Sequence, residues 1–190
     1  MALDLSHMHL RQPPTSIWQL PQLRTLDLAG NRLKVLPDSI AQSLQLEYLD
    51  LSGNELTALP DSIGQLTRLR VLNLSGNRLT ALPRSIGQLA CLEHLDLAGN
   101  RLTVLPDSIG QLARLQQLIL HHNRLTALPQ SLRKLSALTQ LYLHGNDQLG
   151  LPLELLGPRW YQVLNPRMTT LPAKPSEILH YYFYVGLPIN

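Results

Sequence analysis

The sequence predicts an α/β solenoid, in which short repeats stack side by side and share one parallel β-sheet. Three observations support this prediction: a period of 23 residues, an LxL segment at one place in each period, and a proline followed by a short polar segment at another. Self-similarity at a fixed period of this kind is the sequence signature of a repeat architecture.

The repeats read LxxLxLxxNxLxxLPxxIxxLxx with few departures, and a partial repeat with Leu3, Leu5 and Leu10 precedes them. The full repeats begin at Leu23, Leu46, Leu69, Leu92, Leu115 and Leu138. Positions are counted from the leucine that begins each repeat. In LxL two leucines flank a polar residue, so a short strand turns its leucines to one side. One strand cannot bury them alone, and stacking of neighbouring repeats closes the core.

An asparagine follows each strand, where the chain must turn inward. These asparagines are Asn31, Asn54, Asn77, Asn100, Asn123 and Asn146. Their amides can donate to and accept from buried backbone groups of the turn.

The segments of the "DSIGQL" type return along the outer side, and a proline precedes most of them. These prolines are Pro37, Pro60, Pro83, Pro106 and Pro129. Proline suits the first position of a helical turn, and the neighbouring Ser and Asp side chains are expected to bond the free amides. Because the segments are short and contain Gly64, Gly87 or Gly110, we expect 3₁₀ or single-turn pieces and no long helices.

The repeat resembles the leucine-rich repeat family in its typical 23-residue LPxxIxxL class, over residues 1–156. The resemblance implies a right-handed superhelix, a concave parallel sheet, short 3₁₀ segments on the convex side and an asparagine ladder between coils. It also implies a non-enzymatic module that binds a protein partner through the concave face.

The period fails after Asn146, and the segment KPSEILHYYFYVG at 174–186 has apolar residues at helical spacing. With Ser176 as N-cap, it predicts a helix around 175–185 that caps the last repeat. We therefore expect a repeat domain at 1–156 and a C-terminal cap at 157–190.

The C-terminal segment LGLPLELLGP…KPSEILHYYF also resembles the end of the repeat region in bacterial Roco proteins, where a GTPase domain follows. No GxxxxGK[ST] phosphate-binding loop is present in these 190 residues, so nucleotide binding is not implied. A generic solenoid cap is the alternative explanation of the segment, and it is the favoured one.

Composition bears on the class of function. The net charge is +3 and no Lys/Arg run occurs, so a nucleic-acid footprint is not expected. Cys91 is the one cysteine, which fits a reducing, cytoplasmic compartment. No apolar run of about 18 residues predicts a membrane span, and no signal peptide is recognisable. Catalytic and metal signatures such as GxSxG, HExxH and CxxC are absent, so we expect no enzyme, no cofactor and no metal.

Function is expected on the outward positions of the concave face. Position 5 carries carboxylates at Asp4, Asp27, Asp50 and Asp96. On neighbouring strands about 4.8 Å apart, such carboxylates should repel, raise one another's pKa values and favour a cationic partner. The alternative is that aspartate is a common choice in LDLSGN, held by local hydrogen bonds.

The face changes character toward its C-terminal end, where aromatic, aliphatic and histidine residues replace small and acidic ones. The candidate partner-binding residues there are His94, Ile119, His121, His122, Tyr142 and His144, with Tyr48 as a further member. Exposed aromatic and amphipathic side chains are enriched at binding hot spots. Drift near the last repeats and packing against the cap are alternatives. A zinc site shared by His121 and His144 is a weaker one, since no further ligand is evident.

An arginine column on the loop edge follows the asparagines: Arg32, Arg78, Arg101 and Arg124, interrupted by Glu55. Local pairing with acidic residues explains it, and a rim for an acidic partner is the alternative.

Together these patterns predict a cytoplasmic, non-enzymatic interaction module, possible as a side-by-side homodimer. The alternatives are the regulatory arm of a Roco-type GTPase and a bacterial effector that mimics host repeat proteins.

Overall fold

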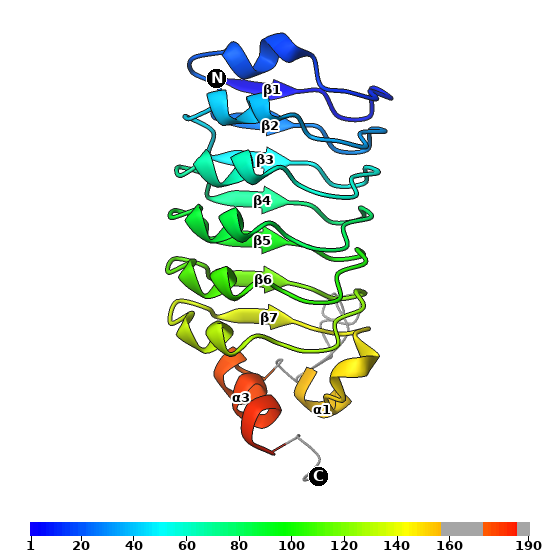
Figure 1. Cartoon of the computed structure of the whole chain (residues 1–190), viewed down its shortest axis with the longest axis vertical. Coiled ribbons are helices and arrows are strands. Elements are labelled where there is room, and N and C mark those ends of the chain that lie inside the picture. The colour runs from blue at the N-terminus through cyan, green and yellow to red at the C-terminus, as the bar shows by residue number, and fades with distance from the viewer. Residues whose placement is uncertain (157–172, 186–190) are drawn as a thin grey trace, which may run out of the picture.

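The computed structural model describes residues 1–156 and 173–185. Each coil of the stack contributes one strand, and consecutive coils lie side by side from the N-terminus to the last strand (Figure 1). Helices α1 (Leu153–Leu156) and α3 (Pro175–His180) lie at the C-terminal end of the stack.

In the described residues seven strands form one parallel sheet in chain order. They are β1 (Ala2–Asp4), β2 (Thr25–Asp27), β3 (Tyr48–Asp50), β4 (Val71–Asn73), β5 (His94–Asp96), β6 (Gln117–Ile119) and β7 (Gln140–Tyr142). The register pairs residues one period apart, as in Leu26 with Leu49. Each repeat position therefore forms a column across the sheet, and the predicted parallel solenoid is confirmed.

The outer segments are 3₁₀ turns, as predicted. They are η1 (Thr15–Gln19), η2 (Asp38–Gln42), η3 (Asp61–Gln65), η4 (Arg84–Gln88), η5 (Asp107–Gln111), η6 (Gln130–Lys134) and η7 (Asp147–Leu149).

The prediction for the start of these turns is wrong by one residue. Pro60 is the N-cap residue of η3, and its carbonyl oxygen accepts a hydrogen bond from the Ile63 amide at 3.1 Å. The expected side-chain caps do not form at η2 to η6 in the structure. The polar side chains have other partners, since the Ser62 hydroxyl donates to an Asp38 carboxylate oxygen in the previous coil at 3.0 Å.

Successive 3₁₀ turns approach one another closely where the outer segments carry glycine. A β-carbon at Gly87 would lie 2.4 Å from the Ser108 carbonyl oxygen, and one at Gly110 would lie 2.4 Å from that of Ser131. The turns therefore pack backbone against backbone, which a larger side chain would prevent.

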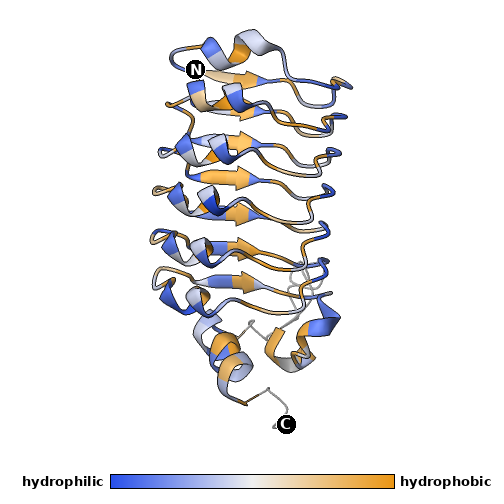
Figure 2. Ribbon diagram, viewed as in Figure 1, coloured by the Kyte–Doolittle hydropathy of each residue, from blue (hydrophilic) through white to orange (hydrophobic). Residues whose placement is uncertain are grey.

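The core is a stack of leucine layers between the sheet and the turns. Leu26, Leu49 and Leu72 in the strands are fully buried, as is Ile63 in η3. Figure 2 shows apolar residues along the strands and hydrophilic residues at the loop tips beyond them. Burying one such side chain contributes roughly 1.5–3 kcal/mol, so the many equivalent layers supply most of the favourable term.

The predicted asparagine ladder is present. The Asn77 side-chain nitrogen donates to the Leu74 carbonyl at 3.0 Å and to the Leu51 carbonyl of the previous coil at 2.9 Å. Its oxygen accepts from the Leu56 amide at 3.0 Å. Buried backbone groups that stacking alone would leave unpaired are satisfied in this way.

The C-terminal helix is present, but its predicted start at Ser176 is wrong. Lys174 is the N-cap residue, and its amide donates to a Glu177 carboxylate oxygen at 3.1 Å. Pro175 occupies the first helical position, where its fixed φ and missing N–H are tolerated. Ser176 consequently lies inside the first turn.

Helix α3 continues into a π-helical turn, η8 (Tyr181–Val185), and covers the end of the core. Ile178 and Leu179 are buried, and the Tyr182 hydroxyl accepts a hydrogen bond from the Leu128 amide at 3.1 Å. The division into domains 1–156 and 157–190 stays a prediction, and residues 157–172 and 186–190 lie outside the described residues. No helix among the residues described is long and apolar enough to cross a membrane.

Candidate partner-binding face

Strand register places the C-terminal candidates in two columns of the concave face. His94 on β5 pairs with Gln117 on β6, and Ile119 lies between Asp96 and Tyr142 on the adjoining strands. Ile119, His94 and Tyr142 are all partly exposed. An aliphatic and an aromatic side chain are therefore neighbours on the open face.

His121 and His122 follow β6 and extend this surface toward the loop edge. The carbonyl of His121 accepts from the Gly99 amide at 2.9 Å, and the amide of His122 donates to the His144 carbonyl at 2.7 Å. The rings of His121 and His122 meet edge to face, with centroids 5.4 Å apart.

His122 occupies a backbone position that the other full coils give to glycine. Its φ is 54°, and the matching residues with positive φ are Gly30, Gly53, Gly76, Gly99 and Gly145. A side chain at this position requires a left-handed backbone conformation, which few residues adopt easily. Strain of this kind persists at functional sites.

His144 was expected to project from the face, and its exposed fraction is only 7%. Ala98 occupies the same column two coils earlier, and its exposed fraction is also 7%. Position 7 lies where the chain begins to turn inward toward the asparagine, so side chains at this position do not point fully into solvent. His144 lies behind the surface, and His121 is half-buried beside it.

Burial lowers the pKa of His121, and the neighbouring His122 and His144 lower it further. Charging an imidazole among other imidazoles in a partly dry site is unfavourable. At neutral pH His121 is therefore an uncharged, amphipathic side chain. We name the surface formed by His94, Ile119, His121, His122 and Tyr142 the C-terminal patch.

Tyr48 does not belong to this patch. It lies on β3, and its hydroxyl donates to an Asp50 carboxylate oxygen at 3.3 Å. Burial raises the pKa of the Tyr48 phenol, and the Asp50 charge raises it further. Tyr48 thus lies beside the acidic column, and we call the surface formed by Tyr48 and the column residues Asp27, Asp50 and Asp96 the acidic half of the face.

The acidic column is held mainly by local hydrogen bonds. Asp50 accepts from the Ser52 amide at 2.8 Å and from the Asn73 side chain at 2.9 Å, and it is only 8% exposed. Asp27 accepts from the Ala29 amide at 2.8 Å, and Asp96 binds the equivalent amide of its own coil at 2.9 Å. These contacts favour the alternative that the aspartates are held by local hydrogen bonds.

The expected rise of pKa through mutual repulsion is wrong at Asp4. Hydrogen bonds from the Ser6 amide and hydroxyl lower the pKa of the Asp4 carboxyl. The pKa of Asp96 is raised, but burial is the main cause and the Asp50 charge a smaller one. Hydrogen bonds and burial outweigh repulsion between coils in both cases.

Among the described residues no group of three or more His, Cys, Asp or Glu side chains could hold a metal ion. The sequence interpretation also missed Arg11 and Lys34, which line an open hollow with Arg32 at the loop edge. The signal was present, because position 12 is basic only in the first two coils and is threonine in the next four.

Known protein families that match this chain share its repeat architecture. A family profile described as "Leucine-rich repeat region" matches residues 61–154, and one described as "Leucine rich repeat" matches residues 21–79. The chain is a leucine-rich repeat protein. No curated protein matches it.

Solved leucine-rich repeat structures resemble the chain at appreciable identity. The leucine-rich repeat domain of the type III effector XopL is 33% identical, with a TM-score of 0.72, and the match covers 77% of this chain and 53% of that one. A leucine-rich repeat protein of Leptospira interrogans is 35% identical, with a TM-score of 0.57 and coverage of 75% and 48%. This leucine-rich repeat chain thus spans about half the length of both.

A third structure shows a repeat domain with a bound partner. It is the ectodomain of the plant receptor kinase GASSHO1/SCHENGEN3 from Arabidopsis thaliana in complex with CASPARIAN STRIP INTEGRITY FACTOR 2. It is 33% identical to this leucine-rich repeat protein, with a TM-score of 0.65, and the match covers 70% of this chain and 17% of that one.

Proposed function

We propose that this leucine-rich repeat protein is a non-enzymatic interaction module that binds a protein partner through its concave face, with the C-terminal patch as the anchor. Repeat domains with the same fold occur in complexes with partners, among them the plant receptor ectodomain above and the BIR3–SERK2 complex. Their presence supports protein binding as the general role.

One observation carries the choice of surface. In a chain that repeats small residues at positions 7 and 8, one coil instead carries the pair His121 and His122, and His122 adopts a strained left-handed conformation. Ile119 replaces the usual carboxylate beside them, and Tyr142 is its neighbour. Aromatic and amphipathic groups gathered on an open face, beside a strained backbone position, favour a binding surface.

The acidic half of the face has a secondary role in this proposal. Asp27 and Asp96 keep partly exposed carboxylates, while Asp50 is nearly covered. Because a backbone amide already engages one oxygen of Asp27 and one of Asp96, these two carboxylates would orient a cationic region of the partner more than they would contribute affinity. A cytoplasmic location and the absence of enzymatic activity belong to the same proposal.

The chain supplies its own replacement for the test. Ile119→Asp, His121→Ser and His122→Gly together convert LILHHN into LDLSGN, the sequence of the second full coil. This patch variant should keep the fold and lose the proteins that the parent captures from a lysate of the source organism. The matched control is Ala29→Ser, which converts LDLAGN of the first full coil into the same LDLSGN and should retain capture.

Two results would count against the proposal. Capture by the patch variant at the parent's level would exclude the C-terminal patch as the anchor. Equal loss in the patch variant and the control would show that capture depends on the coil structure and not on these side chains. Urea unfolding of each variant separates loss of binding from loss of fold.

A bacterial effector is the second candidate, favoured by the likeness to the XopL repeat domain. Fusion to a translocation reporter in a bacterium with a type III secretion system tests it, and absence of translocation would count against it. The Roco-type arm and the homodimer stay predictions, and none of the solved structures compared above is described as a Roco protein.

A further inference from the structure

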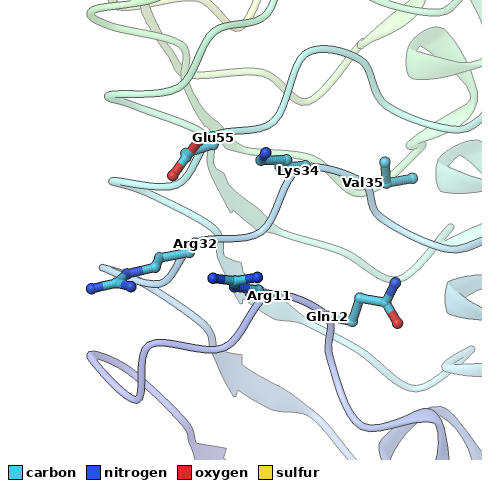
Figure 3. A pocket seen from close by; sticks show the side chains of 6 residues that line it. All are labelled: Arg11, Gln12, Arg32, Lys34, Val35 and Glu55. Carbon is cyan, nitrogen blue, oxygen red and sulfur yellow. The ribbon is translucent and has the colours of Figure 1, made fainter.

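A second charged feature lies at the opposite end of the solenoid from the C-terminal patch. Arg11, Arg32 and Lys34 line an open hollow of about 770 Å³, together with Gln12, Val35 and Glu55. Figure 3 shows Glu55, Lys34 and Val35 along one side of it and Arg32, Arg11 and Gln12 along the other. Three adjoining coils therefore contribute to one concavity.

The asparagine ladder fixes the backbone beneath the hollow. Asn31 accepts a hydrogen bond from the Leu10 amide at 2.9 Å, immediately before Arg11. The Leu33 amide donates to Asn54 at 3.0 Å, between Arg32 and Lys34. Leu33 is fully buried, and the two flanking cations are exposed. The positive groups are thus held on rigid backbone, which lowers the entropic cost of binding a ligand there.

The charge of the hollow is not balanced within it. Glu55 pairs with Arg78 of the next coil at 3.2 Å, so its carboxylate is already engaged. Arg11, Arg32 and Lys34 form no ion pair with any described residue. Three cations that line one hollow without an ion-pair partner give it a net positive charge, which favours an anion there.

The arrangement is confined to the first coils. Position 12 is Arg11 and Lys34 in the partial coil and the first full coil, and it is threonine at Thr57, Thr80, Thr103 and Thr126. Farther along the same edge each coil offers at most one cation, as at Arg101 and Arg124. A double row of cations over a short length suits a single multiply charged group better than an extended polyanion, which needs contacts along its whole length.

We propose that this hollow binds a phosphomonoester group carried by a peptide segment. Guanidinium groups bind phosphate oxygens in a bidentate manner, and a lysine adds a point charge. A phosphomonoester carries about −1.5 to −2 charge near neutral pH, which matches three cations better than a single carboxylate does. Val35 is 67% exposed, and with Gln12 it offers apolar and amide contacts to the chain that bears the phosphate.

The test uses three peptides on the full chain: Gly-Gly-phosphoserine-Gly-Gly, the same peptide with serine, and the same peptide with glutamate. Amide NMR resonances of Arg11, Arg32 and Lys34 report binding at the hollow. The hollow variant carries Arg11→Gln, Arg32→Gln and Lys34→Gln. The matched control carries Arg101→Gln and Arg124→Gln, which removes exposed cations from the same edge outside the hollow.

The phosphoserine peptide should shift these resonances, and its affinity should fall about tenfold or more in the hollow variant and about twofold or less in the control, because charge-assisted bonds to phosphate are strong. Binding should weaken as the pH is lowered from about 7.5 to 5, since the second ionisation of the phosphate lies near 6. Each variant should unfold at the same temperature as the parent protein, which would show that it keeps its fold.

Several results would overturn the proposal. These are no shift with the phosphoserine peptide, equal affinity for the glutamate peptide, and equal loss in the control variant. Inorganic phosphate binding as tightly as the phosphopeptide would assign the hollow to free phosphate. Tighter binding of duplex DNA, lost equally in both variants, would assign the whole edge to a polyanion. The outcome is independent of partner capture by the C-terminal patch.

Discussion

The imidazole of His122 lies against the backbone of Gly145 in the next coil, where a β-carbon at Gly145 would come within 2.6 Å of the His122 Nδ1 atom. Both residues have positive φ, 54° and 68°. His7 lies over Gly30 in the same way, with a contact of 2.3 Å to an added β-carbon. A histidine at position 8 is thus accommodated by a glycine in the coil that follows.

This relationship predicts that His122→Gly stabilises the protein. Relieving the left-handed conformation of a residue with a β-carbon gains about 1–2 kcal/mol, and the freer unfolded chain of glycine offsets about 0.4–1 kcal/mol of this. A net gain of roughly 0.5–1 kcal/mol should appear in urea unfolding. The reverse exchange, Gly76→His, has Gly99 in the next coil and should destabilise by a similar amount. Changes of the same sign in both variants would contradict this account.

Replacing one asparagine of the ladder should be costly. Asn77→Ala leaves the Leu56 amide without its acceptor, whereas the Leu51 and Leu74 carbonyls keep their hydrogen bonds from Asn54 and Asn100. One buried group left unpaired, together with the two lost bonds from Asn77, should cost about 2–4 kcal/mol. Asn73→Ala is the matched control, since Asn73 lies on the concave face and is half-buried. Its loss should be about 1 kcal/mol, because water can replace the bonds. Equal losses in urea unfolding would argue against the ladder's role.

His121 should make stability sensitive to mild acid. Its pKa is lowered in the folded state, mainly by burial, so the unfolded chain takes up the proton first as the pH falls. Stability contributed by neutral His121 is therefore fully present above the ordinary histidine pKa of about 6.5, and it is lost as the pH falls below that value through the lowered pKa of the folded state. His121→Ser should lose less stability over this interval than the parent does. His9→Ser, at an exposed position, is the control, and identical pH profiles for parent and His121→Ser would refute the prediction.

The C-terminal helix should depend on one hydroxyl. Tyr182→Phe leaves the Leu128 amide without its acceptor, and a loss of about 1–2 kcal/mol is expected. Hydrogen exchange of the Leu128 amide should become faster. Tyr184→Phe is the control, because Tyr184 is 58% exposed and its ring, 4.8 Å from the Arg133 guanidinium carbon, is kept. Unchanged exchange in Tyr182→Phe would show that the cap is held elsewhere.

Most of the fold could be predicted from the sequence because the period converts one local pattern into a register. Leu26 pairs with Leu49 since each is the same position of its repeat. The start of each turn was less predictable. Pro60 and Ser176 are both plausible at more than one position, and which one they take depends on hydrogen bonds such as that from Lys174 to Glu177.

The sequence predicted which residues of the candidate site share a column, but not how deeply each side chain is buried. A column does not show that position 7 begins the inward turn, so the burial of His144 could not be read from it. Nor does it show that Asn73 donates a hydrogen bond to Asp50 of the previous coil, because that contact requires the coils to be stacked. The hollow beside Arg11 was missed for a related reason, since its residues come from three coils.

The glycines of the outer turns have a consequence for the shape of the binding surface. In a stack of coils the spacing on the inner side is set by the strands, about 4.8 Å apart, and the outer spacing by whatever separates the turns. Gly64, Gly87 and Gly110 bring successive turns nearly to backbone contact. This limits how far the coils spread apart on their outer side, so the stack curves gently. The curvature of the face proposed to bind a partner is therefore encoded by residues on the opposite side of the molecule.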